Sequence, residues 1–574
     1  MVDLVITGGT VVDGTGAEPR VADVAVTDGI VTDVATAGSL AGTAAARTID
    51  ADGLLVTPGF VDIHTHFDGQ ITWDPLLTPS CWHGVTTVVF GNCGVGFAPA
   101  RPDRHDWLIG LMEGVEDIPG AALSEGIQWG WESYPEYLEA VEQVPKSLDV
   151  GSQIPHGAVR AYVMGERGAK NQPATAEDID AMAVIVREAI AAGALGVSTS
   201  RTIAHMAIDG EPVPGTFAAE DELFGIGRAL ADAGGGIFEL APAGALGEDL
   251  AAPDREMDWM RRLSAAIGRP VTFALTQNDH DPDSWRRMLE LAGQARAEGA
   301  RVRPQVAGRP VTLLLGLETF HPFAYSPSWA EVGLLPLAGK VAKLRRDAEL
   351  RARLIREAST PDPAMVQFLD PAKAYPLGDP PDYEPAASDS VAARATRAGR
   401  DTYELYLELL LEQDGKALVM RPLLNYTDAN LDAVREMLLH PTSAWGLGDG
   451  GAHCGTTCDA STPTFMLTHW ARDRDHDQLP LEWVVRKMTA ETGSLYGLGD
   501  RGTLEPGKRA DLNVIDHAGL TLHAPEMVYD LPGDARRFVQ RADGYVATVV
   551  AGAVTFEHGE DTGARPGQLI RGAR

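Results

Sequence analysis

The chain has 574 residues, which is too long for one compact core and long enough for a barrel with a second domain. Its 48 basic and 81 acidic side chains give a formal net charge of −33, which repels phosphate backbones and argues against nucleic acid as a partner. Hydrophobic residues make up 44% of the chain, as in ordinary soluble proteins, and no apolar run approaches the about 18 residues that a membrane helix needs.

Both ends of the chain have the pattern of a small antiparallel sheet. Residues 1–57 alternate short β-branched runs with Gly and Asp turns, and the runs at 511–516 and 545–552 repeat this pattern. We therefore expect a small β-sandwich assembled from residues 1–57 and 491–574. The first nine residues lack the basic segment and cleavage site of an export signal, and four cysteines are too few for a disulfide framework. Both features favour a cytoplasmic protein.

The middle of the chain, residues 58–490, alternates strands with amphipathic helices, which is the pattern of a parallel α/β sheet. Examples are the expected strands at 87–90, 195–199 and 271–275 and the expected helix at 175–192. About eight such units fit into this length, so we expect a TIM-like (β/α)8 barrel. At about 340–420 the alternation is interrupted by an insertion with a helix over 403–411. An insertion of this size beside a barrel mouth would serve either as a lid or only as packing.

The strongest chemical signal follows the turn Pro58-Gly59. A short apolar strand leads from this turn into His64-Thr65-His66. In a strand, residues i and i+2 share a face, so the two imidazoles project side by side. Such a pair suits a borderline cation such as zinc, although an isolated His-x-His is more often structural. Its position at the end of an apolar strand, where barrel active sites form, favours the metal-binding interpretation.

Together with further motifs, this segment resembles the amidohydrolase superfamily, specifically its N-acyl-D-amino-acid deacylase (D-aminoacylase) branch. The resemblance covers most of the chain and rests on the opening at 58–66, the run at 84–88, the turn Gly91-Asn92-Cys93-Gly94 and the closing run at 501–512. The opening and closing motifs are highly specific when they occur jointly. The resemblance implies a zinc-dependent barrel enzyme with a small-molecule amide substrate. Members of the superfamily are often dimers or larger, so a homo-oligomer is compatible with it.

The resemblance also implies roles for two further residues. Cys93 stands where the branch has a metal-bridging cysteine, whereas a lone cysteine after a strand would otherwise be a small buried hydrophobe. Asp449 looks like the last-strand aspartate that binds metal and accepts a proton from the attacking water. The alternative for Asp449 is a structural aspartate in a Gly-rich turn. The predicted ligands of one or two zinc ions, or of another divalent metal, are therefore His64, His66, Cys93 and Asp449.

Two positions depart from the branch, which carries histidines at the ends of the fifth and sixth strands. The expected fifth strand, 236–242, has Glu239 instead, and the sixth, 271–278, ends with Gln277 and Asn278. His280 lies beyond the sixth strand and is an expected loop residue. Two interpretations follow. Either the site is rebuilt with Glu239 or Gln277 completing the ligand shell, or it holds one metal or holds it weakly, and the substrate is not an N-acyl-D-amino acid.

The lysine and tyrosine with which the branch binds the substrate carboxylate also lack counterparts. Arg201, at the expected end of the fourth strand, is the first candidate for a bidentate carboxylate clamp, although a surface ion pair explains it nearly as well. Arg309 is a weaker alternative. His205 could restore a lost imidazole ligand, although a loop histidine is more often simply exposed. His205, Gln277 and His453 are further candidates for substrate contact, and His453 is equally compatible with a metal ligand or a loop residue.

The predicted activity is metal-dependent hydrolysis of a small-molecule amide, with deacylation of an N-acyl-D-amino acid as the leading reaction. Opening of a cyclic amide or lactam on the same site is the first alternative, and a compact pocket without an anion clamp would favour it. A barrel that has lost its metal and serves as a binding or scaffold protein is an alternative from another class. The separation of Cys454 and Cys458 is not a familiar zinc spacing, so no second metal site is expected there.

Overall fold

The computed structural model of the chain describes residues 2–360 and 365–572. Parallel strands form two arrays, in the orders β6-β7-β8 and β9-β10-β11-β12-β13-β17. Only Gln153 separates β8 from β9, so these two runs count as one of the eight barrel strands. A parallel bridge between Thr65 and Gly450 joins the segments that follow the first strand, β6, and the last strand, β17. The predicted (β/α)8 barrel is thereby confirmed. Its strands are β6 (Phe60–Asp62), β7 (Val85–Phe90), β8 (Asp149–Ser152), β9 (Ile154–Pro155), β10 (Gly196–Ser200), β11 (Ile237–Ala241), β12 (Val271–Ala274), β13 (Val302–Val306) and β17 (Ala444–Trp445).

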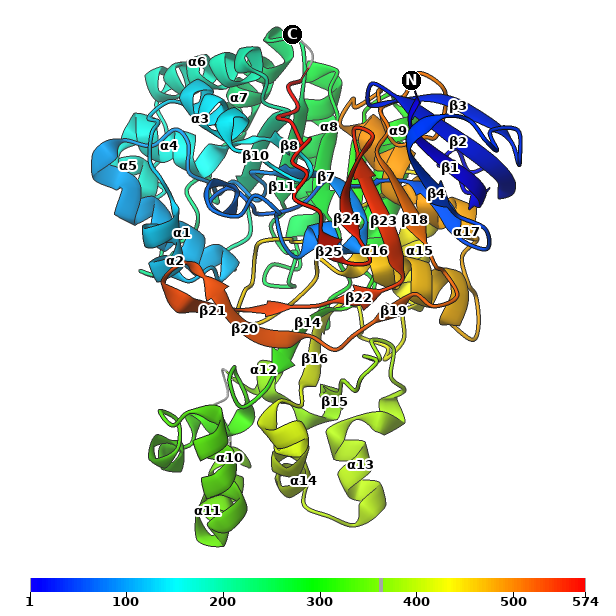
Figure 1. Cartoon of the computed structure of the whole chain (residues 1–574). Helices are drawn as coiled ribbons and strands as arrows, with labels where there is room; N and C mark the ends of the chain where they lie inside the picture. Colours follow the sequence, from blue (N-terminus) through cyan, green and yellow to red (C-terminus); the bar gives the residue numbers. More distant parts are fainter. Residues whose placement is uncertain (1, 361–364, 573–574) are drawn as a thin grey trace.

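The barrel strands are short runs in which almost every residue is buried, because helices cover the outside of the barrel and side chains fill the inside. Helix α6 begins at a capping box in which Thr175 and Asp178 satisfy each other's backbone N–H groups, and it ends at Gly193 with a φ of 115°. Figure 1 shows the helices around the strands. They include α1 (His105–Glu116), α4 (His156–Met164), α6 (Ala176–Ala192), α7 (Glu220–Asp232), α8 (Ala252–Ile267), α9 (Ser284–Ala297) and α15 (Asp432–Leu439).

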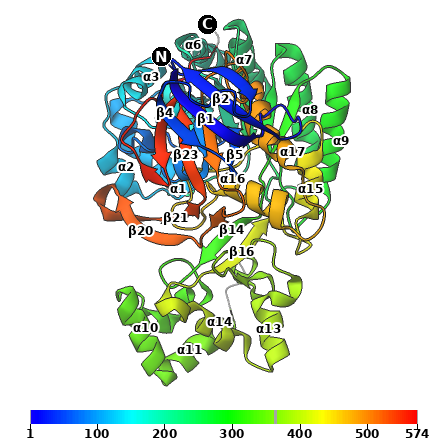
Figure 2. The same cartoon turned by 45° about the vertical axis from the view of Figure 1, so that its right-hand side comes forward.

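A second, largely antiparallel sheet combines both ends of the chain, as predicted. Its order is β25-β24-β23-β18-β5-β1-β2-β3, and the antiparallel pair β5–β18 joins the two ends. Figure 2 shows strands from both ends of the chain side by side in this sheet, for example β5 and β23. The sheet has a hydrophobic core of its own, which includes Leu4, Val24 and Val549. The expected domain boundaries, 57/58 and 490/491, stay predictions. The strands are β1 (Val2–Val11), β2 (Arg20–Thr27), β3 (Ile30–Thr36), β5 (Leu55–Pro58), β18 (Leu512–Ile515), β23 (Tyr545–Val550), β24 (Ala553–Glu557) and β25 (Glu560–Asp561), with β4 (Ala45–Asp50) paired to β1.

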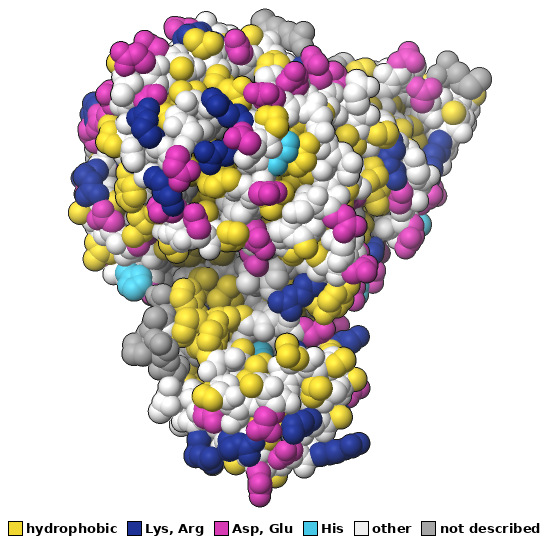
Figure 3. All heavy atoms as spheres, turned by 90° about the vertical axis from the view of Figure 1, so that its left-hand side faces the viewer, with side chains coloured by type: hydrophobic (Ala, Val, Ile, Leu, Met, Phe, Trp, Pro, Cys, Tyr) yellow, Lys and Arg dark blue, Asp and Glu magenta, His cyan; other side chains and the backbone are white. Residues whose placement is uncertain are grey.

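A lobe of helices hangs below the barrel in Figures 1 and 2. The antiparallel strands β14 (Val311–Leu315) and β16 (Val419–Leu424) lead the chain into and out of it, so the excursion begins before the expected residue 340. Figure 3 shows that the molecule narrows above the lobe and that hydrophobic side chains gather there. No helix in the described part of the chain is long and apolar enough to cross a bilayer. The lobe's main helices are α10 (Leu337–Arg346), α11 (Ala348–Ala358), α13 (Val391–Ala398) and α14 (Thr402–Leu410).

Candidate metal centre

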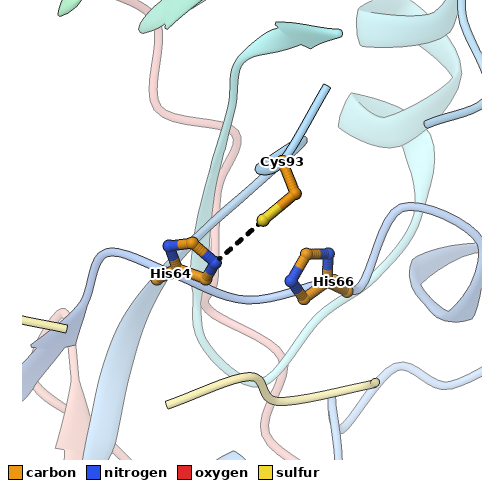
Figure 4. A group of neighbouring side chains, drawn as sticks. All are labelled: His64, His66 and Cys93. Carbon is orange, nitrogen blue, oxygen red and sulfur yellow. Dashed lines mark hydrogen bonds between the residues drawn. The ribbon is translucent and has the colours of Figure 1, made fainter. Parts of the chain in front are cut away.

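The four predicted ligands lie at the carboxyl ends of barrel strands. His64 and His66 follow β6, Cys93 follows β7, and Asp449 follows β17. Thr65, between the two histidines, turns away from them and donates its hydroxyl hydrogen to a carbonyl oxygen of β7 at 2.9 Å. The alternation expected of an extended segment therefore sends both imidazoles to the same side, where Figure 4 shows them beside Cys93.

The two turns that present Cys93 and Asp449 have unusual backbone conformations. The φ angles of Cys93 and Asp449 are 56° and 45°, which lie in the left-handed region that side chains other than glycine seldom adopt. Hydrogen bonds to neighbouring elements hold both turns, because the Cys93 N–H donates to the Glu239 carboxylate at 3.0 Å and the Asp449 N–H donates to the His64 carbonyl oxygen at 3.0 Å. Such conformations are retained where the surroundings over-determine them, often at functional sites.

The side-chain atoms that can bind a metal converge on one point. The ligand atoms of His64, His66 and Cys93 all lie within 4.8 Å of one another, and the Cys93 Sγ is 3.5 Å from the His64 Nε2 (Figure 4). The Asp449 Oδ1 lies 3.4 Å from the Nε2 of His64 and 3.6 Å from the Nε2 of His66. Two imidazole nitrogens, a thiol sulfur and a carboxylate oxygen form a donor set that suits zinc.

The other nitrogen of His64 is hydrogen-bonded, whereas that of His66 lies close to a carboxylate without forming a hydrogen bond to it. The Nδ1 of His64 lies 3.0 Å from the amide oxygen of Gln305, and the Nδ1 of His66 lies 3.3 Å from the Oε1 of Glu116. An acceptor at Nδ1 places the ring proton there and leaves the Nε2 lone pair free. This is the pattern by which metal-binding histidines are oriented. Gln305 therefore favours the His64 tautomer whose Nε2 is free to bind a metal, and Glu116 is the nearest acceptor for the Nδ1 of His66.

The charges at the cluster are unbalanced without a cation. Burial lowers the pKa of His64 to about 4. Burial would also lower the pKa of His66, but the charge of Glu116 and contact with Asp449 raise it to about 9. Burial, and then the negative charge of Glu239, raises the pKa of the Cys93 thiol well above its usual range. A divalent cation would compensate the surrounding carboxylates and hold the sulfur as thiolate, so the residues present fit such an ion.

Glu239 lies beside this cluster, on β11, where the resembling branch has a histidine. Its Oε2 accepts from the Cys93 N–H, and its Oε1 lies 3.8 Å from the Nδ1 of His64. The Oε1 is buried and has no hydrogen-bond partner among the described residues. Burial raises the pKa of the Glu239 carboxyl to about 8. A buried carboxylate oxygen without a partner is what an added cation would satisfy.

Arg201 and Gln277 both have hydrogen-bond partners within the chain, and their expected contacts with substrate stay predictions. The Arg201 guanidinium donates to the carbonyl oxygens of Gly215, Thr216 and Ala218, the last at 2.7 Å, and lies 3.5 Å from a Glu256 oxygen. These contacts hold the loop that carries residues 215–218. The Gln277 side chain donates to Asp428 at 2.9 Å and accepts from the Thr427 N–H, so it fastens the segment that returns from the lobe. Both side chains are engaged because these loops fold back, which sequence spacing does not reveal.

The remaining histidine candidates divide into two groups. His205 and His453 lie near the cluster, since burial and then the charge of His453 lower the pKa of His205 to about 3, and the His453 Nε2 is 3.8 Å from a Glu116 oxygen. His280 is exposed in a loop, as expected. Arg309 is buried, bonded to Asp459 at 2.9 Å, and is part of the framework instead of an anion contact.

Sequence reasoning missed Glu116 and Gln305. Glu116 ends helix α1, where it continues the buried face formed by Leu108, Met112 and Val115. An acidic residue at an apolar-face position was a signal that could have found it. Gln305 lies inside β13, where every residue but one is fully buried, and a buried amide in a barrel strand is a similar signal.

Residues 47–556 match the model of a family described as the amidohydrolase family. An uncharacterized protein of Mycobacterium tuberculosis is 28% identical over 591 aligned positions, which cover 97% of this chain and 92% of that protein. The D-aminoacylase of Alcaligenes xylosoxydans xylosoxydans is 27% identical over 570 positions, covering 99% of this chain and 97% of that enzyme. The solved N-acyl-D-glutamate deacylase of Bordetella bronchiseptica, complexed with zinc and a phosphonate inhibitor, matches with a TM-score of 0.65 at 23% identity over 99% of both chains, which shows a shared fold.

Proposed function

The chain belongs to the amidohydrolase family, and from this premise we propose that it hydrolyses an amide bond of a small molecule and deacylates an N-acyl-D-amino acid. The observation that carries the proposal is the close grouping of the His64, His66 and Cys93 ligand atoms, with the Asp449 Oδ1 3.4 and 3.6 Å from the two Nε2 atoms. The D-aminoacylase among its relatives supports the choice of substrate class.

His64, His66, Cys93 and Asp449 would hold a divalent metal, and zinc is proposed because the donor set suits it and a related deacylase structure contains it. Such a cation supplies Lewis-acid chemistry, which acidifies the attacking water and polarises the substrate carbonyl. Glu239 is proposed as a further ligand in place of the missing imidazoles, since its buried Oε1 lies beside His64 and has no hydrogen-bond partner among the described residues. With Glu239 as a ligand the site could hold one or two ions.

Asp449 is the proposed general base. Contact with His66 and the charge of His64 outweigh its burial and hold the pKa of this carboxyl well below its usual range, so it is ionised at neutral pH. It accepts a proton from the attacking water as the water oxygen bonds to the carbonyl carbon. It then donates this proton to the amide nitrogen as the carbon–nitrogen bond breaks, so that a carboxylate and an amine leave. Gln305 holds the His64 imidazole by a hydrogen bond, and Glu116, 3.3 Å from the Nδ1 of His66, is the proposed orienting partner of the other ring.

Hydrolysis of a cyclic amide is the second candidate. It is favoured by one observation, the engagement of Arg201 with carbonyl oxygens of its own loop, because a cyclic amide has no carboxylate that needs a clamp. A metal-free binding or scaffold protein is the candidate from another class. It predicts that no metal binds to the cluster, so metal analysis separates it from both hydrolases.

The test combines metal content with substrate screening. Protein purified without added metal is analysed for metal, then assayed with N-acetyl-D-amino acids, their L forms and dihydrouracil. We expect one or two equivalents of zinc, less in Cys93→Ala, and unchanged content in Cys81→Ala, which removes another buried thiol. Asp449→Asn should lower kcat by about 10²- to 10⁴-fold.

The outcomes separate the candidates. Release of amino acid from the D substrates supports the deacylase, and hydrolysis of dihydrouracil alone supports the cyclic-amide enzyme. Absence of metal, with none taken up on reconstitution, would contradict both and support the binding protein.

A further inference from the structure

A cavity of about 840 Å³ lies at the amino ends of the barrel strands. Its lining includes Pro270 and Arg301, which directly precede β12 and β13, and Thr442, two residues before β17. Further lining residues come from α9, α15 and α17 (Leu481–Arg486), which lie on one side of the barrel in Figure 2. The candidate metal centre lies at the carboxyl ends of the strands, so this cavity is at the opposite end of the barrel.

Positive charge is concentrated in the lining of this cavity, although the whole chain carries a formal charge of −33. Glu491 is the single carboxylate among the lining residues. Facing it are five cationic side chains: Arg296, Arg301, Arg303, Arg486 and Lys487. Because a concave surface focuses the field of its charges, such a lining attracts small anions.

Lys487, Arg303 and Glu491 form the floor of the cavity and are joined by hydrogen bonds and ion pairs. Lys487 is buried, donates to the carbonyl oxygen of Ser443 at 2.8 Å and lies 3.1 Å from a Glu491 oxygen. The Arg303 guanidinium reaches the same Glu491 oxygen at 2.9 Å and the same Ser443 carbonyl oxygen at 3.2 Å. One carboxylate is thus shared by two cations, so the floor keeps an excess of positive charge.

Three further lining cations, Arg296, Arg301 and Arg486, form the rim of the cavity and have no acidic partner among the described residues. Within the part of the chain that the structure describes, Arg301, Arg486 and Arg296 form no ion pair with a carboxylate, and Arg296 donates only to the Pro441 carbonyl oxygen at 3.0 Å. The rim cations act on the floor: besides burial, the charges of Arg296 and Arg301 lower the pKa of Arg303. Like charges held together in this way are relieved by a bound anion.

We propose that this cavity binds a small molecule through a phosphate or polyphosphate group. The volume lies in the range of ordinary ligand pockets, roughly 300–1,000 Å³. Arginine forks are suited to phosphate oxygens, and the buried Lys487, whose N–H groups bind Ser443 and Glu491, adds positive charge beneath them. Trp483 lines the same cavity with its ring 5.4 Å from the Lys487 Nζ, which offers an apolar surface to the rest of the molecule.

Titration calorimetry at fixed ionic strength tests the proposal on the metal-loaded, full-length protein. The probes are inorganic phosphate, pyrophosphate and adenosine triphosphate. We expect saturable binding of pyrophosphate near one equivalent, weakened roughly a hundredfold in the double variant Arg301→Gln/Arg486→Gln, since each lost charged contact costs about tenfold. The control is Arg287→Gln, which removes an exposed arginine from α9 outside the cavity and should bind as the wild type does.

The probes also distinguish the source of the phosphate. Tighter binding of the nucleotide, lost in Trp483→Leu, identifies a nucleotide-like ligand, whereas equal binding of pyrophosphate and the nucleotide identifies the phosphate group alone. Melting temperatures and metal contents of the variants check that they are folded. Absence of saturable binding to the wild type overturns the proposal. Binding that persists in the double variant also overturns it, because the anion then sits elsewhere, for example at the metal.

Discussion

A histidine binds a metal through one ring nitrogen, and the partner of the other nitrogen decides which one is available. In this chain those partners are unlike each other. His64 meets the neutral amide of Gln305, whereas His66 meets the carboxylate of Glu116, and both partners are buried. The charged partner makes His66 the more basic of the two rings. We therefore expect the pair His66–Glu116 to contribute more to metal affinity than the pair His64–Gln305.

Glu116→Gln should weaken metal binding by about 10- to 100-fold, because the amide supports the imidazole less strongly and the His66 ring can turn. The dissociation constant is measured by competition with a chromophoric chelator, which does not depend on catalysis. Glu113→Gln is the matched control, since Glu113 lies on the same helix and is not among the side chains that face His66. An unchanged dissociation constant in Glu116→Gln would show that Glu116 has no orienting role.

The residues that sequence analysis could place are those whose geometry is local. His64 and His66 share a face because they are two residues apart in an extended segment, and Cys93 and Asp449 were recognised by motif. Gln305 is 241 residues from His64, so its contact depends on how β13 packs into the barrel. For the same reason the hydrogen bonds of Arg201 could not be predicted, because they depend on the path of a loop and not on sequence spacing.

At the scale of elements, a buried polar network fastens helix α7 to helix α4. Glu222 of α7 accepts from Arg160 at 2.8 Å and lies 3.0 Å from the Nε2 of His156, and all three side chains are buried. Burial alone would raise the pKa of Glu222, but the contacts with His156 and Arg160 lower it to about 2. The helices and strands themselves were predictable from apolar periodicity, whereas this network was not, because it joins residues about 60 positions apart in the sequence.

Glu222→Gln should destabilise the protein by on the order of 3 kcal/mol at pH 6, and by less at pH 3. The folded-state pKa lies below the unfolded value of 4.5, so the stabilisation is complete above that value and is lost as pH falls toward 2. Urea unfolding of wild type and variant at both pH values measures the difference between their free energies of unfolding. The control is Glu220→Gln on the same helix, which loses only an exposed ion pair with Arg262. It should lower the free energy of unfolding only slightly at either pH. An equal loss of free energy of unfolding for Glu222→Gln at pH 3 and pH 6 would show that the charge of Glu222 does not stabilise the fold.

At the scale of the whole molecule, the formal charge of −33 opposes compactness. Added NaCl screens this repulsion, so the melting temperature should rise by on the order of 2 °C between 0.02 and about 0.15 M salt and then level off, since the Debye length is by then about 8 Å. Sucrose at equal osmolality is the control for solvent exclusion. A melting temperature that falls with salt would mean that ion pairs outweigh the net repulsion.

The molecule contains separate hydrophobic cores, and the lobe between β14 and β16 has one of its own. Leu354 on α11 is fully buried in the lobe core, and Leu263 on α8 is fully buried in the barrel core. Truncation of a buried leucine to alanine costs about 2–5 kcal/mol. Because the two cores share no residue, Leu354→Ala should speed hydrogen exchange in the lobe alone and leave metal content unchanged, whereas Leu263→Ala should speed exchange in the barrel strands. Exchange mass spectrometry of both variants resolves this, and faster exchange of the barrel in Leu354→Ala would show that lobe and barrel unfold as one unit.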